Sequence, residues 1–117
     1  MVTRLERYQR QYQNLQAQLG EIGFISSGSI VCRHTSCGKP GCRCQADPPQ
    51  LHGPYWQWTR KVGGRTITRR LDEAEAELYR EWIANGRRLA AIVAQMEKVS
   101  GDAAQLLLRQ ATSASTG

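Results

Sequence analysis

The chain has 117 residues, 40% of them hydrophobic, and a formal net charge of +6. This length favours a single domain over residues 1–117, and the hydrophobic content excludes a chain disordered by composition. The start, MVTRLERYQRQYQNLQ, has no apolar run, and no stretch approaches the ~20 apolar residues of a membrane span. We therefore expect a cytoplasmic protein whose thiols stay reduced. A domain this small usually needs a metal, disulfides or a partner chain to stabilise it.

The N-terminal segment predicts an amphipathic helix over residues 3–22. Its apolar residues recur at alternating steps of three and four, as in the seam of a coiled coil: Leu5, Tyr8, Tyr12, Leu15, Leu19 and Ile22. Thr3 is a candidate N-cap, with Glu6 three residues later as in a capping box. Gly20 or Gly23 would end the helix.

The middle segment, residues 27–71, has no helical period and predicts a small β-sheet. GSIVCR is strand-like, and PYWQWTR and RTITRRL flank Gly63-Gly64 as in a β-hairpin. A two-residue turn would pair Val62 with Arg65, Trp58 with Arg69, and Trp56 with Leu71. One face would then form a core: Trp56, Trp58, Val62, Ile67 and Leu71. The other would be polar and basic: Tyr55, Gln57, Thr59, Lys61, Thr66, Thr68 and Arg70.

The C-terminal segment predicts a longer helix over residues 72–110, followed by a disordered tail over 111–117. Asp72 can cap this helix, and steps of four and three continue along it: Leu78, Trp82, Asn85, Leu89, Ile92, Met96, Val99, Ala103 and Leu106. Asn85 either fixes register in a buried seam or faces solvent. Gly101 is a weak point at which the helix could end or bend.

All four cysteines and both histidines lie between residues 32 and 52. Lys39-Pro40-Gly41-Cys42 has the residues of a tight turn that would return Cys37 toward Cys42, and Cys42 and Cys44 project to one side if extended. These three thiols, with either His52 or Cys32, would form a tetrahedral Zn²⁺ site. Disulfides or free thiols are the alternatives, but neighbouring Cys42 and Cys44 disfavour most bridges. His34 is expected on a strand surface.

The motifs CGKPGCRC, HGPYWQW and GGRT also carry a resemblance. Over about residues 27–95 the chain resembles a small bacterial and archaeal domain family of unknown function, with a CGKPxCxC…HGPY core, a following hairpin and flanking helices. The resemblance implies Cys37, Cys42, Cys44 and His52 as ligand-type residues, which favours His52 over Cys32 as the fourth ligand. It implies no activity.

Positive charge is concentrated in the middle of the chain. Residues 30–70 hold eight Lys or Arg residues against one acid, Asp47, while the flanks are nearly neutral. Clustered cations beside a hairpin are typical of phosphate binding, with DNA favoured over RNA. The expected nucleic-acid contacts are Lys39, Arg43, Tyr55, Lys61, Arg65 and Arg70. Trp56 and Trp58 are expected to pack in the core rather than stack on bases. A protein-interaction adaptor with a structural zinc is the alternative function.

Catalysis is not expected, because only Asp47 lies near the cysteines and no separate nucleophile–base pair is present. Self-association is expected, because a helix over residues 3–20 would measure about 27 Å and one over 72–110 about 58 Å. The shorter helix would leave Met96, Val99 and Leu106 without a partner in the same chain, and a homodimer through residues 78–106 would bury them. The sequence thus predicts an α+β protein, with a zinc-stapled β head between an N-terminal helix and a long coiled-coil-like helix.

Overall fold

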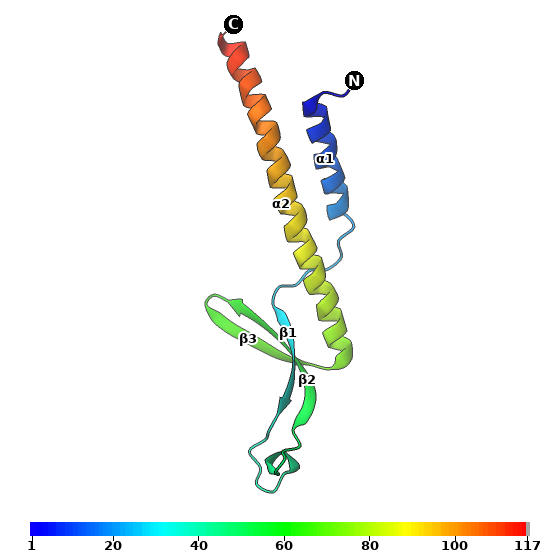
Figure 1. Ribbon diagram of the computed structural model, residues 1–117, viewed down its shortest axis with the longest axis vertical. Coiled ribbons are helices and arrows are strands. Elements are labelled where there is room, and N and C mark those ends of the chain that lie inside the picture. The colour runs from blue at the N-terminus through cyan, green and yellow to red at the C-terminus, as the bar shows by residue number, and fades with distance from the viewer. Residues whose placement is uncertain (117) are drawn as a thin grey trace. The chain divides into compact units, whose positions relative to one another are not determined.

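The computed structural model describes residues 1–116, with side chains to residue 113. Helix α1 (Arg4–Leu19) is followed by β1 (Ser29–Thr35), the 3-10 turn η1 (Arg43–Gln45), β2 (His52–Val62), β3 (Arg65–Leu71) and α2 (Glu73–Thr116) (Figure 1). The predicted α+β fold class is confirmed. The chain divides into two compact units, which we call the head (Phe24–Ala84) and the helical unit (Met1–Gly23 with Asn85–Gly117). Helix α2 contributes to both.

The head contains one antiparallel sheet of order β1-β2-β3. The hairpin register is the predicted one: Trp56 pairs with Leu71, Trp58 with Arg69, and Val62 with Arg65. Gly63 and Gly64 form the two-residue turn with φ of 56° and 79°, a conformation that L side chains rarely adopt. β1 pairs with only part of β2. Its first residue, Ser29, pairs with Thr59, so the last three residues of β2 have no partner in β1.

The core of the head lies where the sheet meets the first turns of α2. Trp58, 8% exposed, and Leu71 pack with Ala76 and Ile83, and Ile30, Trp56 and Tyr79 pack around them. The rings of Trp58 and Tyr79 are 4.8 Å apart between centroids. The Trp58 indole N–H donates to the Ser27 carbonyl at 2.9 Å, which satisfies the one polar group of this buried ring. The inward orientation predicted for Trp58 is therefore present.

Two residues predicted for this core are outside it. Val62 and Ile67 are 41% and 42% exposed. They share the face of Trp58, but they lie toward the Gly63-Gly64 turn, beyond the part of the sheet that packs on α2. Alternation along a strand identifies its face, and it does not reveal how far along the strand the covering layer extends.

Both helices begin at the predicted caps. The Glu6 N–H donates to Thr3 Oγ1 at 3.1 Å, and α1 ends at Gly20. At α2 the capping is reciprocal: the Glu75 N–H donates to Asp72 Oδ1 at 2.8 Å and the Asp72 N–H donates to Glu75 Oε1 at 3.1 Å. Each cap pairs N–H groups that would otherwise lack a partner in the helix.

The predicted C-terminal end of α2 was wrong. The helix passes through Gly101 without a break and continues to Thr116, so the predicted tail is helical over residues 111–116, and Gly117 lies outside the described residues. A glycine in a helix costs about 1 kcal/mol against alanine, which the neighbouring helix formers can offset. The Thr112 hydroxyl donates to the Leu108 carbonyl at 2.9 Å and so does not oppose the helix.

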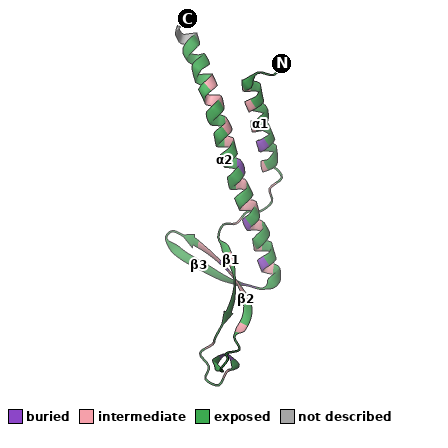
Figure 2. Ribbon diagram, in the orientation of Figure 1, coloured by how far each residue is buried: buried purple, intermediate pink, exposed green. Residues whose placement is uncertain are grey.

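In the helical unit the predicted seams face the interior. Leu15 and Ile92 are buried and the other α1 seam residues are half-buried, as Figure 2 shows along both helices. Leu78, in the head, is exposed, because Ala76 and Ile83 form the face of α2 that packs on the sheet.

Among the described residues, no helix combines the length and apolar content needed to cross a bilayer.

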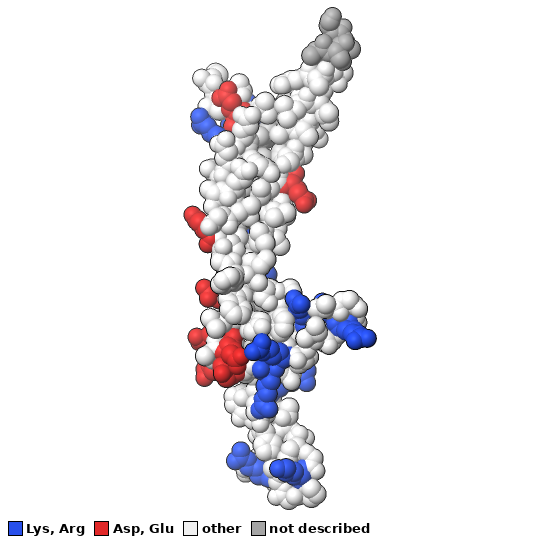
Figure 3. All heavy atoms as spheres, turned by 180° about the vertical axis from the view of Figure 1, so that it is seen from behind, with Lys and Arg blue, Asp and Glu red and all other residues white. Residues whose placement is uncertain are grey.

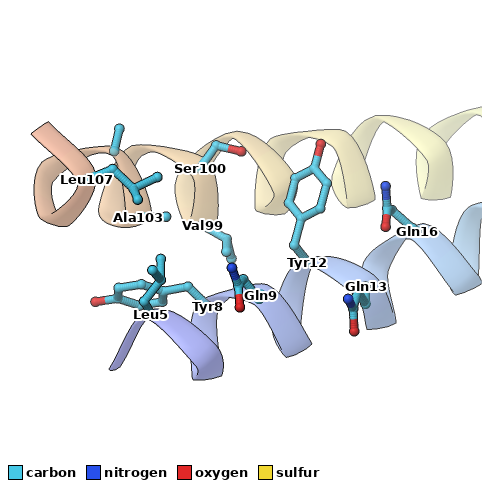
Figure 4. Close-up of a pocket in the computed structure, with 11 residues that line it drawn as sticks. Leu5, Tyr8, Gln9, Tyr12, Gln13, Gln16, Val99, Ser100, Ala103 and Leu107 are labelled. Carbon is cyan, nitrogen blue, oxygen red and sulfur yellow. The ribbon is translucent and has the colours of Figure 1, made fainter. Parts of the chain in front are cut away.

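Val99 and Leu106 have neighbours in the same chain, contrary to prediction. Val99 lines a groove of about 560 Å³ with Tyr8 and Tyr12, and in Figure 4 the Val99 side chain points from α2 toward α1. Leu106 lies beside Tyr8 and Arg4. Residues of α1 therefore lie against this part of α2. Met96 is half-buried.

Candidate metal centre and basic strands

The cysteine-rich loop, residues 36–51, leaves and re-enters the sheet at one point. Thr35 at the end of β1 pairs with His52 at the start of β2, after an irregularity in register between Arg33 and Thr35. Gly53 follows with φ of 129°, and a Cβ atom there would lie 2.7 Å from the Arg33 carbonyl oxygen. A residue without a side chain is therefore required beside His52. His34 is exposed on β1, as expected.

Two tight turns fold the loop. The Cys42 N–H donates to the Lys39 carbonyl at 3.3 Å, and Gly41 has φ of 81°, which is the predicted Lys39–Cys42 turn. The chain from Cys42 to Cys44 is not extended as expected, because η1 begins directly after Cys42 and the Gln45 N–H donates to the Cys42 carbonyl at 2.9 Å. The Gln50 N–H then donates to the Arg43 carbonyl at 3.1 Å, which returns the chain toward β2.

These turns bring together Cys37, Cys42, Cys44 and His52. The three Sγ atoms and one imidazole nitrogen all lie within 4.8 Å of one another. The Sγ atoms of Cys37 and Cys44 are 3.5 Å apart, and Cys42 Sγ is 3.2 Å from His52 Nε2. A tetrahedral site with metal–sulfur bonds of about 2.3 Å has sulfur–sulfur edges of about 3.8 Å, so this donor set fits a metal ion.

Cys32, the alternative fourth ligand, lies elsewhere. It is exposed on β1, paired with Trp56, and is not part of the cluster. Within residues 1–116 no disulfide joins the four cysteines. The cluster that could bind a metal ion is therefore the Cys37, Cys42, Cys44 and His52 set favoured by the resemblance, whereas the spacing of the cysteines had left Cys32 open.

Hydrogen bonds shift the pKa values of the Cys42 and Cys37 thiols in opposite directions. The backbone N–H of Cys44, with the thiols of Cys37 and Cys44 and the His52 ring, lowers the pKa of Cys42 from 9.0 to about 6. The backbone N–H of Lys39 lowers the pKa of Cys37, but the neighbouring Cys44 and Cys42 thiols outweigh it and the pKa is raised. A thiolate at Cys42 is the ionised form that a metal requires.

The inner side of the cluster is shielded from solvent. Cys44 is 2% exposed, and its Sγ accepts a hydrogen bond from the Cys37 N–H at 3.2 Å. The Gln45 side chain donates to the Cys37 carbonyl and approaches Cys44 Sγ at 3.8 Å. Donors of this type hold metal-bound sulfurs in place and orient the ligands.

The residues predicted to contact nucleic acid lie in two parts of the head. Lys39 and Arg43 are exposed on the cysteine-rich loop, while Lys61 and Arg65 are exposed beside the hairpin turn. Arg65, as the partner of Val62, lies on the opposite face of the hairpin from Lys61. Tyr55 is half-buried, because the Arg70 guanidinium lies 3.5 Å from the centroid of its ring.

Three further arginines of the head contact its aromatic or acidic side chains, and they were not among the predicted nucleic-acid contacts. Arg60 lies 5.5 Å from the Trp58 ring centroid, and Arg80 lies 4.4 Å from that of Trp56. Arg69 forms an ion pair with Glu75 at 3.3 Å. The alternation of β2 could have placed Arg60 beside Trp58, two residues away, but Arg80 comes from α2 and its position depends on the tertiary fold.

Comparison with known families gives one match. Residues 2–81 match a family model described as a domain of unknown function, DUF6788. Comparisons with curated proteins and with solved structures gave no match. The matched segment includes α1, the whole sheet and the candidate metal cluster, and it covers more than half of the chain. The chain therefore belongs to the DUF6788 family, a family of unknown function.

Proposed function

We propose that this protein is a nucleic-acid-binding protein, with a zinc-stabilised basic head and a helical unit that self-associates, acting as an accessory factor rather than an enzyme. The observation that carries the proposal is the charge of the hairpin. Between residues 48 and 71 the chain has five Arg or Lys residues and no Asp or Glu. The adaptor function remains the alternative if no nucleic acid binds.

A structural zinc is supported by the donor set. Three thiolates and an imidazole are the Cys₃His ligands of structural zinc sites, and four protein donors leave no coordination position for water. The only acid of the cysteine-rich loop is Asp47. The role we assign to the metal is to cross-link a loop that contributes few residues to the core.

The distribution of charge over the head supports polyanion binding. Figure 3 shows Lys and Arg side chains on the projecting hairpin and at the end that carries the cysteine-rich loop, while Asp and Glu gather at the start of α2. The acids of α2 are partly engaged, since Glu75 pairs with Arg69. A concentration of one sign of charge attracts polyanions and steers their approach.

Self-association of the helical unit is supported by its exposed apolar side chains. Val93, Leu107 and Leu108 on α2 are exposed. Val93 and Leu107 are 14 residues apart, close to four helical turns, and so lie on one side of α2. A second copy would cover them.

The direct test of the function is binding of the purified, metal-loaded chain to labelled duplex DNA, single-stranded DNA and RNA. At ~50 mM salt, where phosphate contacts are strongest, we expect saturable binding to at least one of them. No binding to any of the three would remove the nucleic-acid function and leave the adaptor function.

A further inference from the structure

The outer part of the β2–β3 hairpin is a two-stranded ribbon without a covering layer. Three residue pairs lie beyond the last residue paired with β1: Arg60 with Ile67, Lys61 with Thr66, and Val62 with Arg65. We call these pairs and the Gly63-Gly64 turn the ribbon tip. Every residue of the tip except Arg60 is exposed, and in Figure 1 the tip extends away from the first turns of α2.

The exposure of apolar side chains on the ribbon tip requires a physical explanation. A two-stranded hairpin is marginally stable in water, and here Val62 and Ile67 remain exposed on one face. Arg60 ties the base of the tip to the core through the Trp58 ring, so the tip is anchored where it leaves the sheet. The tip carries three cations and no acid, and no ion pair occupies Lys61 or Arg65 among the described residues.

The dimensions of the tip match those of the major groove of B-DNA. Three residues of a strand extend about 10 Å and paired strands are about 4.8 Å apart. The major groove of B-DNA is about 12 Å wide and about 8.5 Å deep and admits a two-stranded ribbon. The major groove of duplex RNA is too narrow for side chains to enter, and a single strand offers no groove.

We infer that the ribbon tip binds in the major groove of duplex DNA, an inference that rests on the proposed nucleic-acid function and specifies its ligand. The exposed residues supply the contacts that such a groove accepts. Lys61 and Arg65, on opposite faces, reach phosphates or guanine edges, and Thr66 can bond to either kind of base pair. Val62 and Ile67 contact thymine methyl groups, which accounts for their exposure.

The decisive variant removes the two outer pairs of the tip and keeps the rest of the hairpin. Joining Arg60 to Ile67 through Gly63-Gly64 leaves a hydrogen-bonded pair beside the two-residue turn, as Val62 with Arg65 is in the wild type, and removes two cations: Lys61 and Arg65. The matched control removes two cations from α1, by Arg7→Gln and Arg10→Gln. We expect at least tenfold weaker binding of duplex DNA by the tip deletion, less than twofold by the control, and unchanged metal content in both.

Because the deletion also removes Val62 and Thr66 and shortens the ribbon, Lys61→Gln with Arg65→Gln serves as a second variant that leaves the backbone intact, and several-fold weaker binding is expected. The groove is tested with the intact protein. Duplex DNA with glucosylated hydroxymethylcytosines, which fill the major groove, should bind at least tenfold more weakly, while netropsin in the minor groove should have no effect.

The outcomes separate the inference from the function it rests on. No nucleic-acid binding by the intact chain would overturn both. Binding that survives both tip variants, that netropsin blocks, or that is equal for duplex DNA, duplex RNA and single strands would overturn the inference and leave the function in place. If the tip cations only protect the edge of β3 from pairing, the Gln variants will aggregate and their soluble fraction will bind DNA as the wild type does.

Discussion

Thr35 and His52 are cross-strand partners at the base of the cysteine-rich loop. The pairing puts the His52 ring beside the cysteines that the intervening turns bring back, with Nε2 3.2 Å from Cys42 Sγ. The last pair of a two-strand ladder thus also positions the fourth candidate ligand, so metal binding and pairing of β1 with β2 should stabilise each other.

We predict about one Zn²⁺ per chain and loss of structure in residues 36–51 on chelation. Cys42→Ser should lose the metal and become insoluble or partly unfolded, since the loop has no apolar core of its own. Cys32→Ser is the matched control and should keep the metal, because Cys32 lies outside the cluster. Native mass spectrometry and metal analysis measure both. A folded, metal-free, disulfide-bonded chain would contradict the site, and metal retention by His52→Ala would exclude His52 as a ligand.

Acid should release the metal. The pKa of Cys42 is lowered from 9.0 to about 6, so its thiolate stabilises the folded loop fully above pH 9.0, and this contribution is lost as the pH falls through about 6. Because a bound ion favours the thiolate further, we expect the metal to be retained from pH 8 to pH 7 and released only at or below about pH 6. A chromogenic zinc chelator follows the release. Loss that is already complete at neutral pH would show that the Cys44 N–H does not stabilise the Cys42 thiolate as the geometry indicates.

Trp58→Ala should destabilise the head by about 3–5 kcal/mol, because it removes a buried indole from the contact with Tyr79 and leaves the Ser27 carbonyl without its donor. Trp58→Phe should cost less, since one aromatic ring is kept, while the pyrrole part of the indole and its hydrogen bond to Ser27 are lost. Urea unfolding of the metal-loaded chain measures both. A stable Trp58→Ala variant that had lost only single-strand binding would mean that Trp58 stacks on bases.

The hairpin was the most predictable part of the fold. Gly63-Gly64 fixes a two-residue turn, and that turn fixes every pair from Val62 with Arg65 to Trp56 with Leu71. The extent of the core was not predictable in the same way, because burial of Trp58 and exposure of Ile67 depend on where α2 crosses the sheet. Similarly, Val99 lies against α1, and periodicity carries no information about how far along α2 the contacts with α1 extend.

For the candidate ligands, too, the local sequence predicts one part of the arrangement, and the rest depends on how the strands pair. Lys39-Pro40-Gly41-Cys42 encodes its turn locally, so the approach of Cys37 to Cys42 was predictable. The choice between His52 and Cys32 was not, because it depends on the register of β1 against β2. That register places Cys32 opposite Trp56 and His52 at the loop.

Self-association should depend on the exposed apolar side of α2. We expect light scattering at micromolar concentrations to give about twice the 13.1 kDa chain mass. Val93→Glu should weaken the dimer at least tenfold, because it would bury a charge. Ala91→Glu adds the same charge at an exposed position on the opposite side of the helix and should have little effect. A wild-type monomer across this range would contradict a dimer.

Nucleic-acid binding should be strongly salt-dependent. If Lys39, Arg43, Lys61, Arg65 and Arg70 each contact a phosphate, the slope of log K against log salt is about −4.5, and affinity falls about 500-fold between ~50 and ~200 mM salt. Lys61→Glu with Arg70→Glu should abolish measurable binding at the higher salt and make the slope less negative by about 2. Arg7→Glu with Arg10→Glu changes net charge equally on α1 and should leave the slope unchanged. Fluorescence anisotropy with circular dichroism and metal analysis separates lost contacts from lost fold. Equal weakening by both double variants would mean that net charge, rather than the head, governs binding.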